Sequence, residues 1–180
     1  QLADNLYGGF GSAPKFPNTS NLLFLLRAYD YSGITKYRDF VNFTADKMDS
    51  GGIHDHVGGG FARYSTDQRW LVPHFEKMLY DNALLSVLYS ELSSITLNPN
   101  YSNVLEKILK YVQREMTSNE GAFYSSQDAD SEGEEGKYYL WSYKDLEKIV
   151  DSEVFEIFTD RFGVTQGGNF EGKNILIKYT

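Results

Sequence analysis

One stretch of the sequence, residues 51–82, contains all three histidines and the densest run of residues able to do chemistry. His74 follows Pro73, and proline is favoured at the first helical position, so we predict that His74 lies in the opening turn of a helix. Asp81 is seven residues further on and, at about 100° per residue, roughly 20° away around that helix. The two side chains would share one face, with His74 as general acid or base and Asp81 orienting a ligand. The alternative is a structural role, in which loop backbone and arginine side chains form hydrogen bonds with both residues, as is usual for buried polar residues.

Glu76 belongs to the same predicted turn but lies about 200° from His74 around the helix axis. A carboxylate in the first turn is stabilised by the helix dipole, which favours a helix-stabilising role for this residue. A catalytic role is the alternative, so Glu76 is a third catalytic candidate beside His74 and Asp81.

Asp55 stands between His54 and His56 in a glycine-rich stretch that we expect to be a loop. Alternate residues of an extended segment point the same way, so the two imidazoles would converge on one ligand, next to Asp55. A metal site needs at least a third protein ligand, and a lone His-x-His pattern is a weak signal for one. We therefore predict a substrate contact here, with neither a metal nor a cofactor.

Arg63, Tyr64 and Trp70 follow in the same stretch and supply a fork of hydrogen-bond donors and flat aromatic faces. Such groups suit ligands that are rich in hydroxyls or negatively charged, so the three residues are candidates for substrate binding. Aromatic residues make up 16% of the chain, and a core role for Tyr64 and Trp70 is therefore an equal alternative.

Asp128 and Asp130 begin an acidic run that resembles the start of a calcium-binding loop, with oxygen-bearing residues at alternate positions followed by glycine. The resemblance fails at the twelfth position, where Tyr139 stands in place of a bidentate glutamate. An acidic loop in water is the favoured interpretation. The alternative is that both carboxylates face the same cavity as His54 and His56, where paired carboxylates at the right separation would suit glycosidic chemistry.

Four glycine-aromatic segments divide the chain at intervals of about 50 to 60 residues, which is the scale of helical-pair repeats. They begin at Gly8, Gly58, Gly121 and Gly167. Between the first two we predict a helix near residues 21–29 that is apolar on nearly every side and is therefore internal. A second helix, with Thr35 as its N-cap, carries one apolar stripe and is therefore external.

The same contrast returns in the next pair. The helix predicted over 75–92 is apolar all round, and the helix after the turn at 97–100 is apolar on one side. A weaker third pair begins with Ser142 and Asp145, which resemble a capping box. Alternating internal and external helices predict an all-α fold of two concentric layers, a toroid of six helical hairpins. Such a ring needs roughly 300 residues, so we expect 1–180 to be a single domain forming its N-terminal half.

Composition narrows the classes of function. The formal net charge is −8, which argues against a nucleic-acid partner because such proteins present clustered Lys and Arg. No apolar run reaches the roughly 18 residues that span a bilayer, so no membrane association is predicted. The chain has no cysteine, which fits a cytoplasmic protein. Because the first residue is glutamine rather than methionine, we expect a trimmed chain or a fragment.

Five segments together resemble the YyaL-like, spermatogenesis-associated family of thioredoxin-domain proteins. They are GGFGSAPKFP (8–17), GIHDHVGGGF (52–61), WLVPHFEKMLYDNA (70–83), YSSQDADSEGEEG (124–136) and GGNFEGKNIL (167–176). The resemblance implies a thioredoxin-like domain followed by a six-hairpin toroid similar to those of N-acylglucosamine 2-epimerases and several glycosidases. This chain has no Cys-x-x-Cys and lacks the thioredoxin-like domain and the later hairpins, so their chemistry does not carry over.

We therefore predict a carbohydrate-active toroid domain, either a sugar epimerase or isomerase or a glycoside hydrolase, with a small sugar as its ligand. In epimerisation a histidine such as His74 would remove a proton beside a carbonyl, whereas in hydrolysis two carboxylates would act. The second hypothesis is a non-catalytic module that binds a ligand or a partner for an accompanying domain. An isolated half ring would also be able to self-associate.

Overall fold

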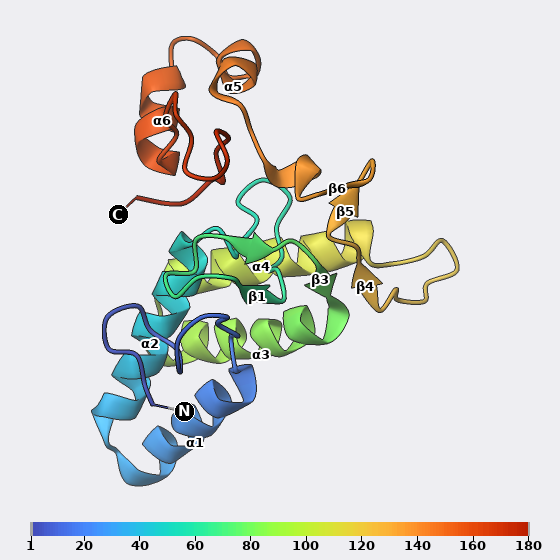
Figure 1. Cartoon of the computed structure of the whole chain (residues 1–180). Coiled ribbons are helices and arrows are strands. Elements are labelled where there is room, and N and C mark those ends of the chain that lie inside the picture. The colour runs from blue at the N-terminus through green and yellow to red at the C-terminus, as the bar shows by residue number, and fades with distance from the viewer. Residues whose placement is uncertain (1, 180) are drawn as a thin grey trace.

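The computed structural model describes residues 2–179 as a helical body whose connecting segments contain three short sheets (Figure 1). Two hairpins of long helices form the body. They are α1 (Thr19–Ser32) with α2 (Thr35–Ser50), and α3 (Leu79–Thr96) with α4 (Pro99–Glu115). Helix α3 packs against both α1 and α4, so the hairpins lie side by side, in agreement with the two helical pairs that the sequence predicts.

Long and short connections alternate along the chain. Only residues 33–34 and 97–98 separate the two helices of each hairpin, whereas residues 51–78 lead from α2 to α3. The long connections therefore gather at one end of the helices. Their antiparallel sheets pair β1 (Tyr64–Ser65) with β2 (Pro73–His74), β3 (Lys77–Met78) with β4 (Ser126–Gln127), and β5 (Asp130–Ser131) with β6 (Glu134–Glu135).

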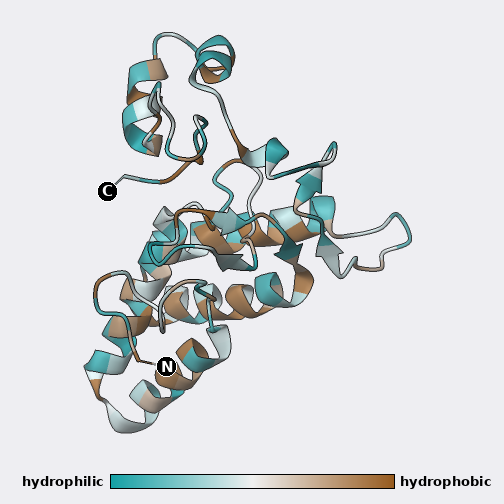
Figure 2. Cartoon of the chain, in the orientation of Figure 1, coloured by the Kyte–Doolittle hydropathy of each residue, from teal (hydrophilic) through white to brown (hydrophobic). Residues whose placement is uncertain are grey.

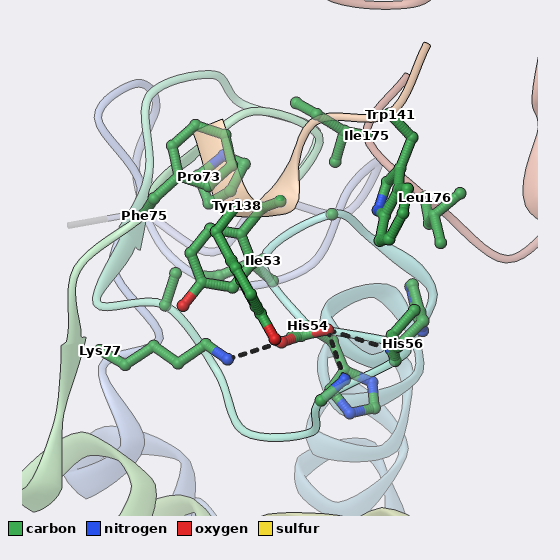
Figure 3. A pocket seen from close by; sticks show the side chains of 16 residues that line it. Ile53, His54, His56, Pro73, Phe75, Lys77, Tyr138, Trp141, Ile175 and Leu176 are labelled. Carbon is green, nitrogen blue, oxygen red and sulfur yellow. Dashed lines mark hydrogen bonds and ion pairs between the residues drawn. The ribbon is translucent and has the colours of Figure 1, made fainter. Parts of the chain in front are cut away.

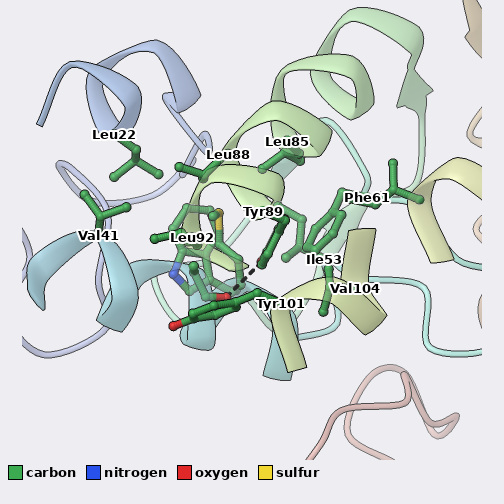
Figure 4. Packing of buried hydrophobic residues seen from close by; sticks show 14 of the residues in the cluster. Leu22, Val41, Ile53, Phe61, Leu85, Leu88, Tyr89, Leu92, Tyr101 and Val104 are labelled. Carbon is green, nitrogen blue, oxygen red and sulfur yellow. Dashed lines mark hydrogen bonds between the residues drawn. The ribbon is translucent and has the colours of Figure 1, made fainter. Parts of the chain in front are cut away.

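The main core lies where the four long helices meet (Figure 4). Leu22, Val41, Leu88 and Tyr89 have no exposed surface, and burial of each apolar side chain stabilises the fold by about 1.5 to 3 kcal/mol. The hydroxyl of Tyr89 donates a hydrogen bond to the carbonyl oxygen of Ala45 at 2.9 Å, which ties α3 to α2.

The prediction that the first helix of each pair is buried on every side is wrong for these residues. Helix α1 leaves Phe24 70% exposed, and α3 leaves Val87 47% exposed, although Leu26 and Leu85 on their other faces are fully buried. The physical reason is that, within residues 2–179, no further helix packs against the outward apolar sides of α1 and α3. Figure 2 shows the apolar residues along α1 and α3.

The capping box predicted at Ser142 and Asp145 agrees with the structure, because Ser142 caps α5 (Tyr143–Ile149) by accepting a hydrogen bond from the backbone of Asp145. In the predicted turn at 97–100, Asn98 caps α4 in the same way from Asn100. The prediction of Thr35 as an N-cap is wrong, because Ile34 holds that position and Thr35 is already helical.

The C-terminal part of the chain forms a smaller unit. Helices α5 and α6 (Phe155–Phe162) pack around a core of Leu146, Val164 and Leu176, and a short 3-10 helix, η1 (Lys137–Tyr139), precedes them in the chain. Lys178 joins this unit to α2, because its backbone N–H donates to Ser50 and its ammonium contacts the Asp49 carboxylate at 2.7 Å. Across residues 2–179, none of the helices combines the length and apolar character that crossing a bilayer requires.

We expect the change Ser142→Ala to destabilise α5 by about 1 kcal/mol, because the first turn loses the side-chain acceptor for the amide of Asp145. Hydrogen exchange at the amides of α5 would measure this as roughly fivefold faster local opening. Ser152→Ala, in the exposed turn between α5 and α6, is the matched control and should leave those amides unchanged. Equal acceleration in both variants would show that the cap contributes nothing.

Candidate functional site

The segment before α3 is extended, and this overturns the helix predicted to begin at residue 75. His74 in β2 pairs with Tyr64, and Lys77 in β3 pairs with Gln127, so the helix begins only at Leu79. The backbone N–H of Arg63 also donates to the carbonyl oxygen of Glu76. These partners satisfy backbone groups that the first turn of a helix would leave without an intrahelical bond.

Extended geometry divides the side chains of residues 73–78 between two faces. Pro73, Phe75 and Lys77 are buried, while His74 and Glu76 are half-buried on the opposite face. His74 and Glu76 therefore share a face because alternate residues of an extended segment point the same way, and not because both lie in one helical turn.

His74 and Glu76 belong to a polar group that we call the His74 cluster, defined as Arg63, Tyr64, His74, Glu76 and Asp81. The guanidinium of Arg63 lies 3.5 Å from the Glu76 carboxylate, and Nε2 of His74 lies 3.9 Å from the same carboxylate. The rings of Tyr64 and His74 are stacked at 4.9 Å. Five residues that the sequence offered as candidates thus lie together at the N-terminal end of α3.

The orientation of His74 depends on Glu135, which the sequence analysis missed. Nδ1 of His74 lies 2.9 Å from the Glu135 carboxylate on β6. A carboxylate at Nδ1 selects the tautomer with its proton there, which leaves Nε2 as the basic nitrogen on the side of Glu76. The acidic run around Glu135 gave no signal beyond a solvated loop, because its contact with residue 74 spans 61 positions.

Asp81 is the perturbed carboxyl of the cluster. Burial raises its pKa to about 6, and the neighbouring Arg63 opposes this only in part. Oxygen Oδ2 of Asp81 and Nε of Arg63 are both buried and have no hydrogen-bond partner among the described residues. A hydroxyl-bearing ligand would supply both the missing donor and the missing acceptor.

Trp70 lies elsewhere, so its predicted contact with substrate is not supported. Its side chain has no exposed surface, and its indole N–H donates to the carbonyl oxygen of Tyr7 at 2.8 Å. The ammonium of Lys15 lies 5.1 Å from the ring. The residue fills the space under the N-terminal loop, which is the core role that the sequence left open.

The other histidines line a separate space that we call the histidine cavity, with a volume of about 140 Å³. It lies between the loop after α2, the buried face of residues 73–77 and the C-terminal unit. Figure 3 shows His54 and His56 at one end, Lys77 to their left, and Trp141, Ile175 and Leu176 on the opposite side. No residue of the His74 cluster lines it.

Each buried imidazole in the cavity is anchored through one nitrogen. Nδ1 of His54 lies 2.9 Å from the Asp49 carboxylate, and Nε2 of His56 lies 3.1 Å from the carbonyl oxygen of Gly51. Nε2 of His54 and Nδ1 of His56 are buried without a partner among the described residues. Burial lowers the pKa of both side chains, that of His56 to about 3, so both are neutral at physiological pH.

Lys77 is a second residue that the sequence analysis missed. Its buried ammonium contacts the Asp55 carboxylate at 2.8 Å, donates to the carbonyl oxygen of Gly59 at 2.9 Å, and lies 4.4 Å from the Tyr111 ring centre. Asp55 is thus the partner of a buried cation, although the sequence offered it only as a ligand contact. Alternate side chains of an extended segment point the same way. An extended interpretation of residues 73–78 would therefore have predicted that Lys77 is buried on the same face as Pro73 and Phe75.

Asp128 and Asp130 lie at neither the His74 cluster nor the imidazoles. They line a second cavity of about 280 Å³ that shares Asp55, Lys77 and Tyr139, among others, with the histidine cavity. The predicted common cavity is therefore two neighbouring spaces with one wall in common. Within residues 2–179, no three histidine, aspartate or glutamate side chains are grouped so that they could hold a metal ion.

We expect His56 to make the stability of the protein fall at acidic pH. The pKa of about 3 in the folded state lies below the ordinary value of about 6.5, so between these values only the unfolded chain takes up the proton. The stability that the fold has with neutral His56 is therefore complete above pH 6.5 and is lost progressively as the pH falls toward 3. At pH 5 the loss amounts to about 2 kcal/mol, at roughly 1.4 kcal/mol per pH unit.

Urea unfolding of the protein and of His56→Phe between pH 7 and 5 would measure this effect. The difference in unfolding free energy between the two should shift by about 2 kcal/mol in favour of the phenylalanine variant, because its ring cannot be protonated. Val41→Ala, a fully buried change without a titrating group, is the control and should give a difference independent of pH. A parallel response of His56→Phe and Val41→Ala would contradict the burial of a neutral imidazole.

Comparison with curated proteins gives close relatives along almost the whole chain. Human spermatogenesis-associated protein 20 is 38% identical over 207 residues, which cover 98% of this chain and 26% of the human protein. The mouse protein of the same name is 39% identical, and an uncharacterized protein of Caenorhabditis elegans is 36% identical, each over 97% of this chain and 26% and 28% of the relative. The chain thus spans about a quarter of these relatives. No protein-family model matches it.

Comparison with solved structures identifies the fold. A cellobiose 2-epimerase from Bacillus thermoamylovorans superposes with a TM-score of 0.62 at 17% identity, over 71% of this chain and 36% of the epimerase. A sugar epimerase from a ruminal bacterium gives 0.62 at 16% identity, over 71% and 35%. A D-mannose isomerase gives 0.56 at 19% identity, over 67% and 30%. The chain therefore has the fold of part of an α/α toroid, as predicted from its helical pairs.

Proposed function

Because this chain belongs to the spermatogenesis-associated protein 20 family and has part of the toroid fold of sugar epimerases, we propose that it serves carbohydrate chemistry, as the site of an epimerase or isomerase. The observation that supports this most is the His74 cluster, where a histidine, a carboxyl with a pKa of about 6 and an arginine meet. These are the groups that a proton transfer beside a carbonyl requires.

In the proposed reaction, the open-chain form of an aldose lies against the stacked Tyr64 and His74 rings. Nε2 of His74 removes the proton from the carbon next to the carbonyl, and the electron pair of the broken C–H bond forms an enediolate. Arg63 donates hydrogen bonds to the developing oxyanion. Return of a proton to the same carbon from the opposite face re-forms the carbonyl and gives the epimer. Its return to the former carbonyl carbon gives the ketose, with transfer of the proton of the carbon-2 hydroxyl to the former carbonyl oxygen. The net proton count is unchanged.

Asp81 suits the second proton transfer. A carboxyl with a pKa of about 6 exchanges a proton readily near neutral pH, which is the property that general acid–base catalysis favours. Glu135 holds the tautomer of His74 through Nδ1 and is therefore a positioning residue. Hydrolysis is less well supported, because Asp128 and Asp130 line a cavity to which neither Glu76 nor Asp81 contributes.

Solvent exchange tests the proposal directly. The purified protein would be incubated in deuterium oxide with mannose, cellobiose and an N-acylglucosamine, and proton NMR would follow the signal at carbon 2. The expected result is deuterium at carbon 2 together with formation of the epimer or ketose. Release of a reducing sugar without exchange would favour a hydrolase. Neither exchange nor release from folded protein, with no sugar-dependent shift in its own spectrum, would overturn the proposal.

We propose further that the exposed apolar residues of α1 and α3 cause the chain to self-associate. Phe24, Leu84, Val87 and Ile95 are 37% to 70% exposed, and monomeric proteins rarely leave such groups uncovered together. Sedimentation velocity should give a mass above that of the 20.5 kDa chain that rises with concentration. Val87→Glu should weaken this association about tenfold, because it places a charge on the surface to be buried.

Leu109→Glu is the matched control for that experiment. Leu109 is 46% exposed and Val87 is 47% exposed, but Leu109 lies on α4 and not on α1 or α3. An equal effect of the two charges on the sedimenting mass would show that self-association does not use the α1 and α3 face.

A further inference from the structure

The histidine cavity has the features of a second binding site, separate from the proposed sugar site. It faces the opposite side of the segment 73–78, since Pro73, Phe75 and Lys77 line it while His74 and Glu76 belong to the cluster. Its volume of about 140 Å³ is close to that of an engineered apolar cavity of roughly 150 Å³ that binds benzene, so it has room for one aromatic ring. No residue assigned to the proposed reaction contributes to its walls, so the two sites are independent.

Most of the cavity wall is apolar and aromatic. Ile53, Phe75, Ile175 and Leu176 are buried around it. Phe75 stacks on Tyr139 with ring centres 5.5 Å apart and only 9° between the planes, which leaves a flat surface. Trp141 faces this surface from the C-terminal unit (Figure 3). Such walls accept a planar ring.

Hydrogen bonding in the cavity is unbalanced toward acceptors. Asp49 and the carbonyl of Gly51 hold the N–H groups of His54 and His56, so the unpartnered nitrogen on each neutral ring is an acceptor. The ammonium of Lys77 uses two of its three N–H groups for Asp55 and Gly59 and lies 4.4 Å from the centre of the Tyr111 ring, so it is already held by groups of the protein. A ligand that completes this cavity must therefore donate a hydrogen bond.

The charges around the imidazoles favour an uncharged donor. Burial is the main cause of the lowered pKa of both histidines, and the charge of Lys178 lowers the pKa further, so this charge lies close enough to disfavour a ligand cation. An anion would meet the lone pairs of the two imidazole acceptors, and both nearby cations, Lys77 and Lys178, are already paired with Asp55 and Asp49. A neutral hydroxyl meets neither penalty, and its O–H group is a good donor to an imidazole nitrogen.

We propose that the histidine cavity binds the ring of an uncharged phenol, with the ring between Trp141 and the Phe75–Tyr139 stack and the hydroxyl donating to Nδ1 of His56. The same chemistry is carried by a free phenolic molecule and by the tyrosine side chain of a peptide. The exposed mouth of the cavity, formed by Val57 and Tyr138, admits either one.

Calorimetric titration with three probes tests this proposal. The probe 4-methylphenol carries the hydroxyl, 4-methylanisole replaces its proton by a methyl group, and N-acetyl-tyrosinamide presents the same ring on a peptide. The phenol should bind about tenfold more tightly than the anisole, which is the effect of one hydrogen bond to a buried acceptor. Binding of the tyrosine amide at the affinity of the phenol would indicate a peptide ligand, and weaker binding a free phenol.

Two variants locate the site. His56→Phe should bind both small probes but lose the tenfold preference, since it keeps a ring and removes the acceptor. Trp141→Ala should weaken both probes about tenfold, because one wall is lost. The matched control is Tyr124→Ala, an aromatic residue that is 54% exposed and lies outside the cavity, and it should change neither affinity.

The outcomes that would overturn the proposal are separate from those of the sugar assay. Equal affinity of the phenol and the anisole for the unaltered protein would remove the hydrogen bond to His56. Absence of binding by all three probes, with nitrogen-15 NMR shifts of both imidazoles unchanged, would show that the cavity holds only water. Glu76→Gln should leave phenol binding unaltered, so loss of sugar turnover in that variant bears on the proposed function alone.

Discussion

Replacing His74 by glutamine is expected to lower the rate of carbon-2 exchange by a factor of about 10² to 10⁴, the range of a lost general base. Glutamine keeps the approximate size and the hydrogen bond to Glu135 but cannot take up a proton. The unfolding free energy should change by less than about 1 kcal/mol, since the side chain is half-buried and no core group depends on it. The measurement is deuterium incorporation into mannose or cellobiose, with a urea melt on the same sample.

Asp81→Asn tests the proposed reaction more sharply than His74→Gln, because catalytic activity should fall while the free energy of unfolding rises. The pKa of Asp81 is raised to about 6 in the folded state, so the folded chain holds the proton more tightly than the unfolded chain between pH 4 and 6. The stabilisation that protonated Asp81 gives to the folded state is thus complete below pH 4 and is lost as the pH rises through 6. At pH 7.5 the ionised carboxylate destabilises the fold by about 1 kcal/mol, after allowance for screening by solvent.

Asparagine carries no charge, so the variant should gain about that 1 kcal/mol at pH 7.5 and lose most of its exchange activity. A gain in stability with a loss of turnover is typical of residues kept for function rather than for folding. Glu147→Gln, an exposed carboxylate on α5, is the control and should change neither quantity. Lower stability together with lower activity in Asp81→Asn would instead assign the residue a structural role.

Lys77→Met is expected to have the largest effect on stability, a loss of about 3 to 5 kcal/mol. Methionine fills the space of the lysine stem, but the Asp55 carboxylate then remains buried without its cation, and the Gly59 carbonyl loses a donor. Denaturant melts at pH 7 would measure the loss. The double variant Lys77→Met with Asp55→Asn should recover part of it, since the uncompensated charge is gone.

The exposed pair of Lys110 and Glu106 on α4 provides the matched control. Its two side chains are 66% and 61% exposed, and the change Lys110→Met should alter the unfolding free energy by less than about 0.5 kcal/mol. A similar small change for Lys77→Met, or no recovery in the double variant, would show that burial of the Lys77 and Asp55 pair does not control stability.

Part of the candidate site was foreseen for a reason that proved wrong. The sequence placed His74 and Asp81 on one helical face, and the structure brings both into one cluster with Arg63, Tyr64 and Glu76. Their proximity arises because residues 73–78 are extended and pair with residues 63–65 and 126–127. Residue 74 would lie near the start of α3 whether residues 73–78 were helical or extended. The proximity of His74 and Asp81 is therefore no evidence for the predicted helix.

The local sequence determined the elements whose stability comes from near neighbours. The apolar spacing of α2 and α4, the turn before Pro99 and the capping residues Asn98 and Ser142 are all local features, because a helix makes its hydrogen bonds between residues four apart. These features alone predict the two helical hairpins, and the superposed epimerases identify the toroid class to which the hairpins belong.

Tertiary structure decided what depends on distant partners. Glu135 selects the tautomer of His74 across 61 residues, Gln127 turns Lys77 into a strand residue across 50, and Lys178 pairs with Asp49 across 129. Burial of Lys77 and Trp70, and the division of His54, His74 and Asp128 among three separate places, follow from such contacts. Hydrophobic periodicity reports which side of an element is apolar, and it does not report which distant segment covers that side or supplies a hydrogen bond to it.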